Sequence, residues 1–227
     1  MYPEYEKVKA FFSTPLDLLK TDRRMEDIFN HIVNNHAKNV AIEYFNDKGK
    51  VKKLKYKKVL KLIYRYADII NFLFAKEERH KPIVFKATNS YQWVITFWAI
   101  LMNGFKPVLI DARTSKEATQ NLINQSGAVG IVTDDVYPYS VNKISMDDFE
   151  IEEPNGEFVS DWENELVFCS SGTTGDVKLM IYNGENFAHQ IAASIEMPET
   201  TKDIMYPKCY GNVKILAMVP FHHIFGF

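Results

Sequence analysis

Cysteine is scarce in this chain of 227 residues, and no apolar run is long. The two cysteines, Cys169 and Cys209, form no C-x-x-C pair, which speaks against a disulfide framework and favours a reducing compartment. The longest apolar stretch, Trp93 to Met102, is too short to cross a bilayer as a helix. The first ten residues lack the apolar segment of a signal peptide. We therefore expect a cytoplasmic protein without a membrane span.

An excess of charge of either sign is also missing from the chain as a whole. The formal net charge of -2 excludes a global basic signature, so we expect no nucleic-acid partner. A composition that is 46% hydrophobic and 25% charged is typical of a globular protein and excludes a disordered or collagen-like chain. The length suits one large domain, or one domain with part of another.

Two segments nevertheless carry charge of one sign. Lys48 to Lys61 holds eight lysines and no acid, which can attract phosphate or nucleic acid. We favour a solvated turn leading into a helix, because the apolar residues that follow have helical spacing. Asp147 to Glu165 holds nine acids, no base and a Pro-Asn-Gly sequence, which predicts an exposed connector. This connector predicts a first α/β subdomain at residues 1–150 and the incomplete start of a second at residues 151–227.

The apolar pattern alternates between strands and helices. It predicts helices at residues 56–75, 91–102, 117–125 and 185–195, and strands at residues 83–87, 107–110, 130–133, 166–169, 179–182 and 214–219. Asn89 or Ser90 can cap the second of these helices, and Asn103-Gly104 can end it in a left-handed turn. This alternation implies right-handed crossovers and a layered α/β fold with a parallel sheet.

One loop between two predicted strands has the composition of a phosphate site. It carries two glycines for a tight turn, four hydroxyls that can surround phosphate oxygens and a terminal lysine for charge. The spacing G-x-x-G-x-x-K, with no Ser or Thr after the lysine, excludes a Walker A loop. A plain Ser/Thr/Gly turn remains the alternative. The predicted ATP phosphate-binding residues are Ser170, Ser171, Gly172, Thr173, Thr174, Gly175 and Lys178.

The run from Cys169 to Lys178 resembles the phosphate-binding signature of the adenylate-forming enzymes. These are the acyl-CoA synthetases, aryl-CoA ligases, luciferases and nonribosomal-peptide adenylation domains. The family usually shows Pro before the lysine and Gly after it, where this chain has Val177 and Leu179. Its later His-x-Asn is replaced by Gly184-Glu185-Asn186, which keeps only the asparagine.

A second resemblance lies about fifty residues further on, the separation that the family has. Pro220 to Gly226 resembles the family's Pro-x-x-His-x-x-Gly segment at the acyl pocket, and His223 aligns with its histidine. The resemblance implies that Phe221, His223 and Gly226 belong to the substrate pocket. The alternative is that His222 and His223 are ordinary residues at the end of a strand. Adjacent side chains of an extended chain point opposite ways, so we expect no metal site from this pair.

The resemblance spans almost the whole chain and implies the front part of the large N-terminal domain. Family members are more than twice as long and carry later motifs for magnesium, ribose and the adenylation lysine, none of which occurs here. We therefore expect a truncated fragment that is inactive alone, and we assign it no catalytic residue. The implied cofactors are ATP and Mg²⁺, with the magnesium ligand outside this chain, and the implied partners are a small carboxylate and CoA.

Three alternatives remain open on the sequence. The same fold can serve as an adenylation domain that loads a carrier protein, or as a non-catalytic protein that retains the fold. An unrelated nucleotide-binding α/β module is a third possibility, which the two matches at the family's spacing disfavour. We also expect self-association through the surface that a truncated sheet exposes.

Overall fold

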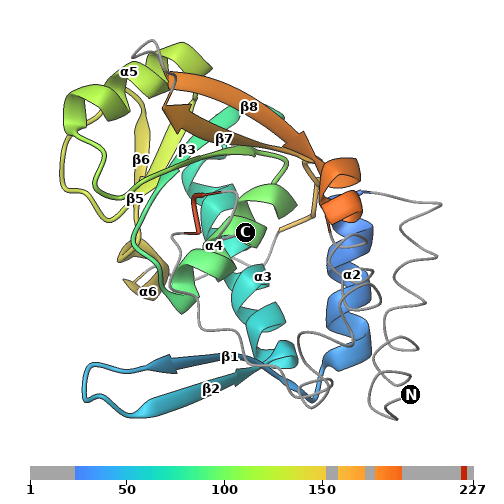
Figure 1. Ribbon diagram of the computed structural model, residues 1–227. Coiled ribbons are helices and arrows are strands. Elements are labelled where there is room, and N and C mark those ends of the chain that lie inside the picture. Colours follow the sequence, from blue (N-terminus) through green and yellow to red (C-terminus); the bar gives the residue numbers. More distant parts are fainter. Residues whose placement is uncertain (1–23, 152–157, 172–176, 191–220, 224–227) are drawn as a thin grey trace, which may run out of the picture.

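The computed structural model describes residues 24–151, 158–171, 177–190 and 221–223 (Figure 1). The labelled helices are α2 (Met25–His36), α3 (Tyr56–Leu73), α4 (Tyr91–Met102), α5 (Lys116–Ser126) and α6 (Asp148–Ile151), and residues 184–190 are also helical. The strands are β1 (Val40–Phe45), β2 (Val51–Lys55), β3 (Pro82–Lys86), β4 (Lys106–Ile110), β5 (Gly130–Thr133), β6 (Asn142–Ser145), β7 (Glu165–Ser171) and β8 (Val177–Asn183). In this part of the chain, no helix combines the length and the apolarity that a bilayer crossing needs.

Six strands form one sheet in the order β6-β5-β3-β4-β7-β8. The pairs β3–β4, β3–β5, β4–β7 and β5–β6 are parallel, and β8 closes the sheet by running antiparallel to β7. The predicted α/β class with a parallel sheet is therefore confirmed. Strands β7 and β8 follow residue 150 in sequence but join the same sheet as β3 to β6, and the predicted division into subdomains stays a prediction.

The sheet separates two apolar cores because successive strand residues point to opposite faces. Ile83 and Phe85 of β3 pack with α3 and α4 on one face, whereas Val84 packs with α5 on the other. Figure 1 shows α3 and α4 on one side of the strands and α5 on the opposite side. The result is a three-layer α/β/α arrangement, since both faces of a parallel sheet have to be covered.

Helix α4 is apolar around most of its circumference, so it lies in the core rather than on the surface. Trp93 and Phe97 are each 2% exposed, and Trp98 packs against them half-buried, so these rings belong to the core. Ser90 Oγ accepts a hydrogen bond from the Trp93 amide at 3.0 Å and caps the helix. Gly104 follows the helix with a φ of 72°. Both predicted ends of this helix are confirmed.

The acidic segment after residue 146 is less exposed than its composition suggests. Phe149 in α6 is fully buried and stacks on Tyr66 of α3, with 4.3 Å between the ring centroids. The amides of Asp161 and Glu163 donate to carbonyl oxygens at the end of α4, at 3.0 and 2.8 Å. The interpretation of the whole segment as an exposed connector is therefore wrong at these points. Single apolar residues and backbone hydrogen bonds anchor it despite its charge.

The region of the lysine run contains a strand that the sequence analysis did not predict. Strand β2 pairs antiparallel with β1 in a hairpin whose turn has Gly49 at a φ of 67°. The predicted turn and the predicted helix from Tyr56 are both present, with β2 between them. Strands β1 and β6 and helices α2 and α6 were also not predicted. The predicted strand at residues 214–219 lies outside the described residues.

Candidate active site

The carboxyl ends of β3, β4, β5 and β7 meet at one edge of the sheet, because these strands run parallel. The chain leaves β3 toward α4 on one face and leaves β4 toward α5 on the other. In open α/β sheets ligands bind where consecutive connections diverge in this way. Polar side chains gather at this edge, namely Lys86, Thr88, Asn89, Asp111, Asp134, Asp135 and Ser170.

Asp111, directly after β4, contacts the side chains of Arg113 and His222. Its carboxylate accepts hydrogen bonds from the Arg113 backbone and guanidinium, at 2.8 Å from the amide and 2.7 Å from Nη2. The Nε2 atom of His222 lies 3.5 Å from Asp111 Oδ2. The Arg113 hydrogen bonds lower the pKa of Asp111 to about 2. Burial lowers the pKa of His222, and Asp111 opposes this effect. Asp111 is therefore an anion that faces a neutral imidazole at neutral pH.

The residue before His222, Phe221, also contacts this edge of the sheet. Asn89 Oδ1, just beyond β3, accepts a hydrogen bond from the Phe221 amide at 3.0 Å. The Phe221 ring packs on Trp93 with 5.2 Å between ring centroids. His223 is exposed. The segment 221–223 is thus attached to the ends of β3 and β4, although more than a hundred residues separate them in sequence.

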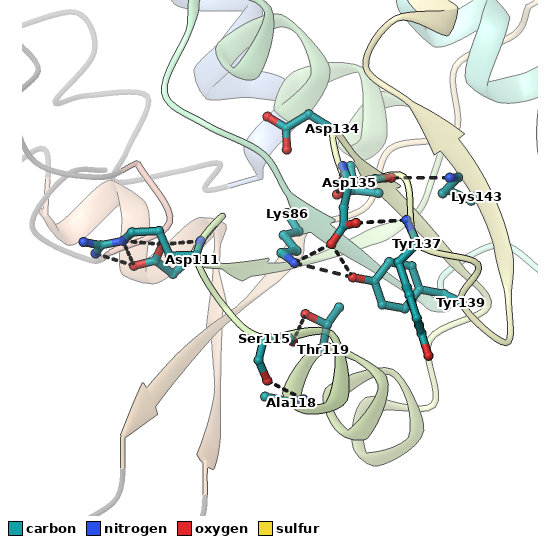
Figure 2. Close-up of polar contacts among 12 residues, drawn as sticks. Lys86, Asp111, Ser115, Ala118, Thr119, Asp134, Asp135, Tyr137, Tyr139 and Lys143 are labelled. Atoms are coloured by element: carbon teal, nitrogen blue, oxygen red, sulfur yellow. Dashed lines mark hydrogen bonds and ion pairs between the residues drawn. The ribbon is translucent and has the colours of Figure 1, made fainter.

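Lys86, the last residue of β3, carries a charge inside the molecule and is 3% exposed (Figure 2). Its Nζ lies 2.9 Å from Asp135 Oδ2 and 3.4 Å from the Tyr139 hydroxyl. The Tyr139 hydroxyl in turn donates to Asp135 Oδ2 at 2.9 Å. A buried charge is tolerated only when it is paired and hydrogen-bonded, and this arrangement provides both.

The protonation states of this pair follow from their contacts. Burial by itself would lower the pKa of Lys86, but hydrogen bonds to Asp135 and Tyr139 outweigh it and the pKa is raised. The Tyr137 amide and the Lys86 ammonium lower the pKa of Asp135 to about 2. Both groups are charged at neutral pH, so the pair is a fixed ionic link between β3 and the turn after β5.

The predicted phosphate loop connects β7 and β8 at the same edge of the sheet. Ser170 is opposite Lys178 in the hairpin register, with Ser170 half-buried and Lys178 exposed. Ser171 ends β7 opposite Val177. Gly172, Thr173, Thr174 and Gly175 lie outside the described residues, as does Gly226 of the predicted substrate pocket. The structure brings together the two ends of the loop, and the roles of its residues stay predictions.

A family model described as AMP-binding enzyme matches residues 29–227 of this chain. The chain belongs to the AMP-binding enzyme family. The match includes both segments on which the resemblance to the adenylate-forming enzymes rested. The comparison with curated proteins gives no match.

Solved structures with the AMP-binding fold resemble the chain at low sequence identity. O-succinylbenzoate coenzyme A synthetase (MenE) from Bacillus subtilis in complex with AMP has a TM-score of 0.67 and 17% identity, covering 87% of this chain and 50% of that one. The same enzyme with ATP and magnesium ion has a TM-score of 0.66 and 15% identity, covering 87% and 52%. The Klebsiella oxytoca NpsA N-terminal subdomain has a TM-score of 0.62 and 17% identity, covering 73% and 43%. The chain therefore spans about half the length of these structures or less.

The sequence analysis did not predict several of the polar residues at this edge of the sheet, although the sequence contains two features that point to one pair of them. Lys86 stands inside the apolar run predicted as the strand at residues 83–87, where a buried charge requires an acidic partner. Asp134-Asp135 follows the predicted strand at residues 130–133. Asp111 directly follows the predicted strand at residues 107–110, and Asn89 was predicted only as a possible helix cap. Nothing in the sequence pairs His222 with Asp111, because the two residues lie far apart along the chain.

Proposed function

We propose that this chain is the front part of an ATP-dependent ligase that activates a carboxylate and transfers its acyl group to the thiol of CoA. In the first step a carboxylate oxygen bonds to the α-phosphorus of ATP, the bond to the bridging oxygen of the β-phosphate breaks, and pyrophosphate leaves. In the second step the thiolate sulfur bonds to the acyl carbon of the adenylate and AMP leaves. The acyl-adenylate links the two steps.

The observation that supports this proposal best is the β7–β8 hairpin. It sets Ser170 opposite Lys178 at the carboxyl edge of the sheet, within the segment that the family match includes. Hydroxyl donors and a mobile cation at that edge suit the β- and γ-phosphates of ATP, because phosphoryl transfer is accelerated mainly by positioning and by neutralising charge. Ser171, Thr173, Thr174, Gly172 and Gly175 complete the proposed loop.

The acyl group is assigned to the segment that begins at Phe221. Phe221 is held against Trp93 and Asn89, and its neighbour His222 lies against Asp111. These contacts support an acyl pocket beside the ends of β3 and β4, to which we assign Phe221, His223 and Gly226. CoA is proposed as the acceptor because MenE carries the name of a coenzyme A synthetase. A carrier protein as acceptor is the alternative.

Magnesium would neutralise the charge of the polyphosphate when it is bound. Among the described residues, no three His, Cys, Asp or Glu side chains form a group that could hold a metal ion. We therefore assign none of the proposed steps to the described residues through the metal. Lys178 is the charged residue of the loop that can contact phosphate directly.

The proposal is tested by titrating the chain with tripolyphosphate while the backbone amide signals of Ser170 and Lys178 are followed by NMR. We expect these signals to shift, and Lys178→Ala to weaken binding about tenfold through loss of a charge-assisted contact. Lys76→Ala, which removes an exposed lysine elsewhere, is the matched control. Unchanged signals at both hairpin positions, or equal affinity for the Lys178 variant, would contradict the phosphate-binding role.

Carboxylate-dependent ATP–pyrophosphate exchange addresses the activity of the same chain. We expect no exchange from residues 1–227 alone, because the family's magnesium, ribose and late lysine motifs do not occur in this sequence. Robust exchange would show that those motifs are not essential here. Binding of tripolyphosphate without exchange is the combined outcome that the proposal requires.

A further inference from the structure

The β1–β2 hairpin projects from the body of the molecule beside the start of α3 (Figure 1). Its inner face is anchored, since Ile42 and Leu54 are cross-strand partners that pack against the core. Tyr44, on the same face, lies 4.3 Å from Tyr91 between ring centroids. The outer face contributes nothing to this packing, so its residues are available for another role.

The hairpin and the first turns of α3 concentrate positive charge. Between Lys38 and Arg65 the sequence has ten basic residues and two acids, although the net charge of the chain is -2. Within the described residues, one lysine of the run, Lys53, forms an ion pair, with Glu43 at 3.1 Å. We call the following exposed residues the lysine surface: Lys48, Lys50, Lys53, Lys55, Lys57, Lys58 and Lys61. Lys52 is opposite Tyr44 on the inner face and is not included.

Large apolar side chains lie among these lysines. Phe45 is 73% exposed and its cross-strand partner Val51 is 51% exposed, so the two form an apolar pair near the tip of the hairpin. Covering an aromatic ring that is exposed to this extent is favourable, because its apolar surface is removed from water. The cross-strand register puts the pair on the outer face, with the Glu43–Lys53 pair.

We propose that the lysine surface, with Phe45 and Val51, docks on an anionic phospholipid bilayer. Unpaired lysines are attracted to anionic headgroups, and each lysine near such a surface contributes about a fivefold gain in partitioning. The apolar pair enters the boundary between headgroups and acyl chains, as the apolar side of interfacial segments does. A bilayer uses both features, whereas duplex nucleic acid would match the charge but leave Val51 in water. This inference does not depend on the proposed function.

The test is cosedimentation of the full chain with vesicles of phosphatidylcholine containing phosphatidylserine, compared with vesicles of phosphatidylcholine alone. We expect binding to the anionic vesicles only, and release at high salt because screening weakens the attraction. The variant Lys50→Gln/Lys55→Gln/Lys58→Gln should bind about a hundredfold more weakly. These lysines are exposed, so the variant is expected to keep its fold, which its thermal unfolding checks.

Two controls separate charge at this place from charge in general. The variant Lys76→Gln/Lys81→Gln/Lys116→Gln removes the same charge from exposed positions elsewhere and should bind like the unchanged chain. Phe45→Ser should weaken binding severalfold, whereas Phe72→Ser, at a residue that is 58% exposed on α3, should not. Equal loss in both lysine variants would overturn the proposal. So would absence of vesicle binding, or binding to a labelled DNA duplex alone.

Discussion

The backbone N–H of Phe221 donates a hydrogen bond to the side-chain oxygen of Asn89 at 3.0 Å, across 132 positions of sequence. Asn89 is itself fixed on both sides. Thr88 before it donates from its amide and hydroxyl to Asp134, at 3.1 and 3.0 Å, and Ser90 after it caps α4. Hydrogen bonds therefore hold the loop after β3 in place, and Phe221 binds to this loop.

Replacing Asn89 by alanine should loosen that attachment. We expect the Phe221 amide to exchange its hydrogen about fivefold faster, because a hydrogen bond of this kind contributes on the order of 1 kcal/mol. Hydrogen exchange followed by mass spectrometry or NMR measures this effect. Asn89→Asp retains an acceptor oxygen and should keep the protection. Asn71→Ala, which removes the acceptor of Arg79 instead, should leave Phe221 unchanged.

Neutralising Asp135 should reduce the free energy of unfolding more than neutralising its partner Lys86. Asp135→Asn leaves the buried ammonium without its counter-ion and should destabilise the chain by about 3 kcal/mol. Lys86→Met should cost less, because Asp135 keeps hydrogen bonds from the Tyr137 amide and the Tyr139 hydroxyl. Urea unfolding of both variants and of the double variant measures the difference. If Lys86→Met is as costly as Asp135→Asn, the buried charge is not the cause.

His222 should make stability depend on pH in the mildly acidic range. Its pKa in the folded chain is lowered from 6.5 because the ring is buried, with the charges of His223 and Arg113 acting in the same direction and Asp111 against them. Protonation therefore favours the unfolded chain. The contribution of His222 is complete above pH 6.5 and is lost as the pH falls through its lowered folded-state pKa.

Thermal unfolding between pH 7 and pH 5 measures this contribution. His222→Gln should show a shallower decline in melting temperature than the unchanged chain. Asp111→Asn removes the opposing charge, so NMR titration of the His222 ring should give a still lower pKa. A higher pKa in that variant would show that Asp111 does not act on His222 electrostatically.

Strand β8 should promote self-association of the chain. In the described residues β8 pairs with β7 alone and forms one edge of the sheet, with Met180 42% and Ile181 63% exposed. An open edge with apolar side chains invites pairing with another chain. In sedimentation experiments the average molecular mass should increase with protein concentration, and the variant Ile181→Lys should show a smaller increase. Val136→Lys, at a residue that is 87% exposed outside any strand, should have no effect.

The regular part of the fold was predictable because burial leaves a clear mark on sequence. Helix α4 and strand β5 have the predicted bounds, since Asn103-Gly104 ends the first and all four residues of the second are buried. Strand β2 was not predictable in the same way. Four of the five positions in Val51–Lys55 are exposed, and one core contact, by Leu54, gives no alternating pattern to detect.

The site was predictable only where it is local in sequence. Ser170 and Lys178 could be assigned to one hairpin because the loop that joins them is short. The contacts of Asp111 with His222 and of Asn89 with Phe221 are long-range, and local propensity contains no information about them. Lys86 lies between these cases, because its buried strand required an acidic partner but did not specify which one.

Strand β7 lies next to β4 in the middle of the sheet, and this position constrains synthesis of the protein. A nascent chain that has emerged from the ribosome only as far as Ile151 has no neighbour for that side of β4. Val108 and Leu109, both fully buried in the finished sheet, would then border an unprotected backbone. Pairing on that side of β4 therefore cannot form until residues 165–171 are available.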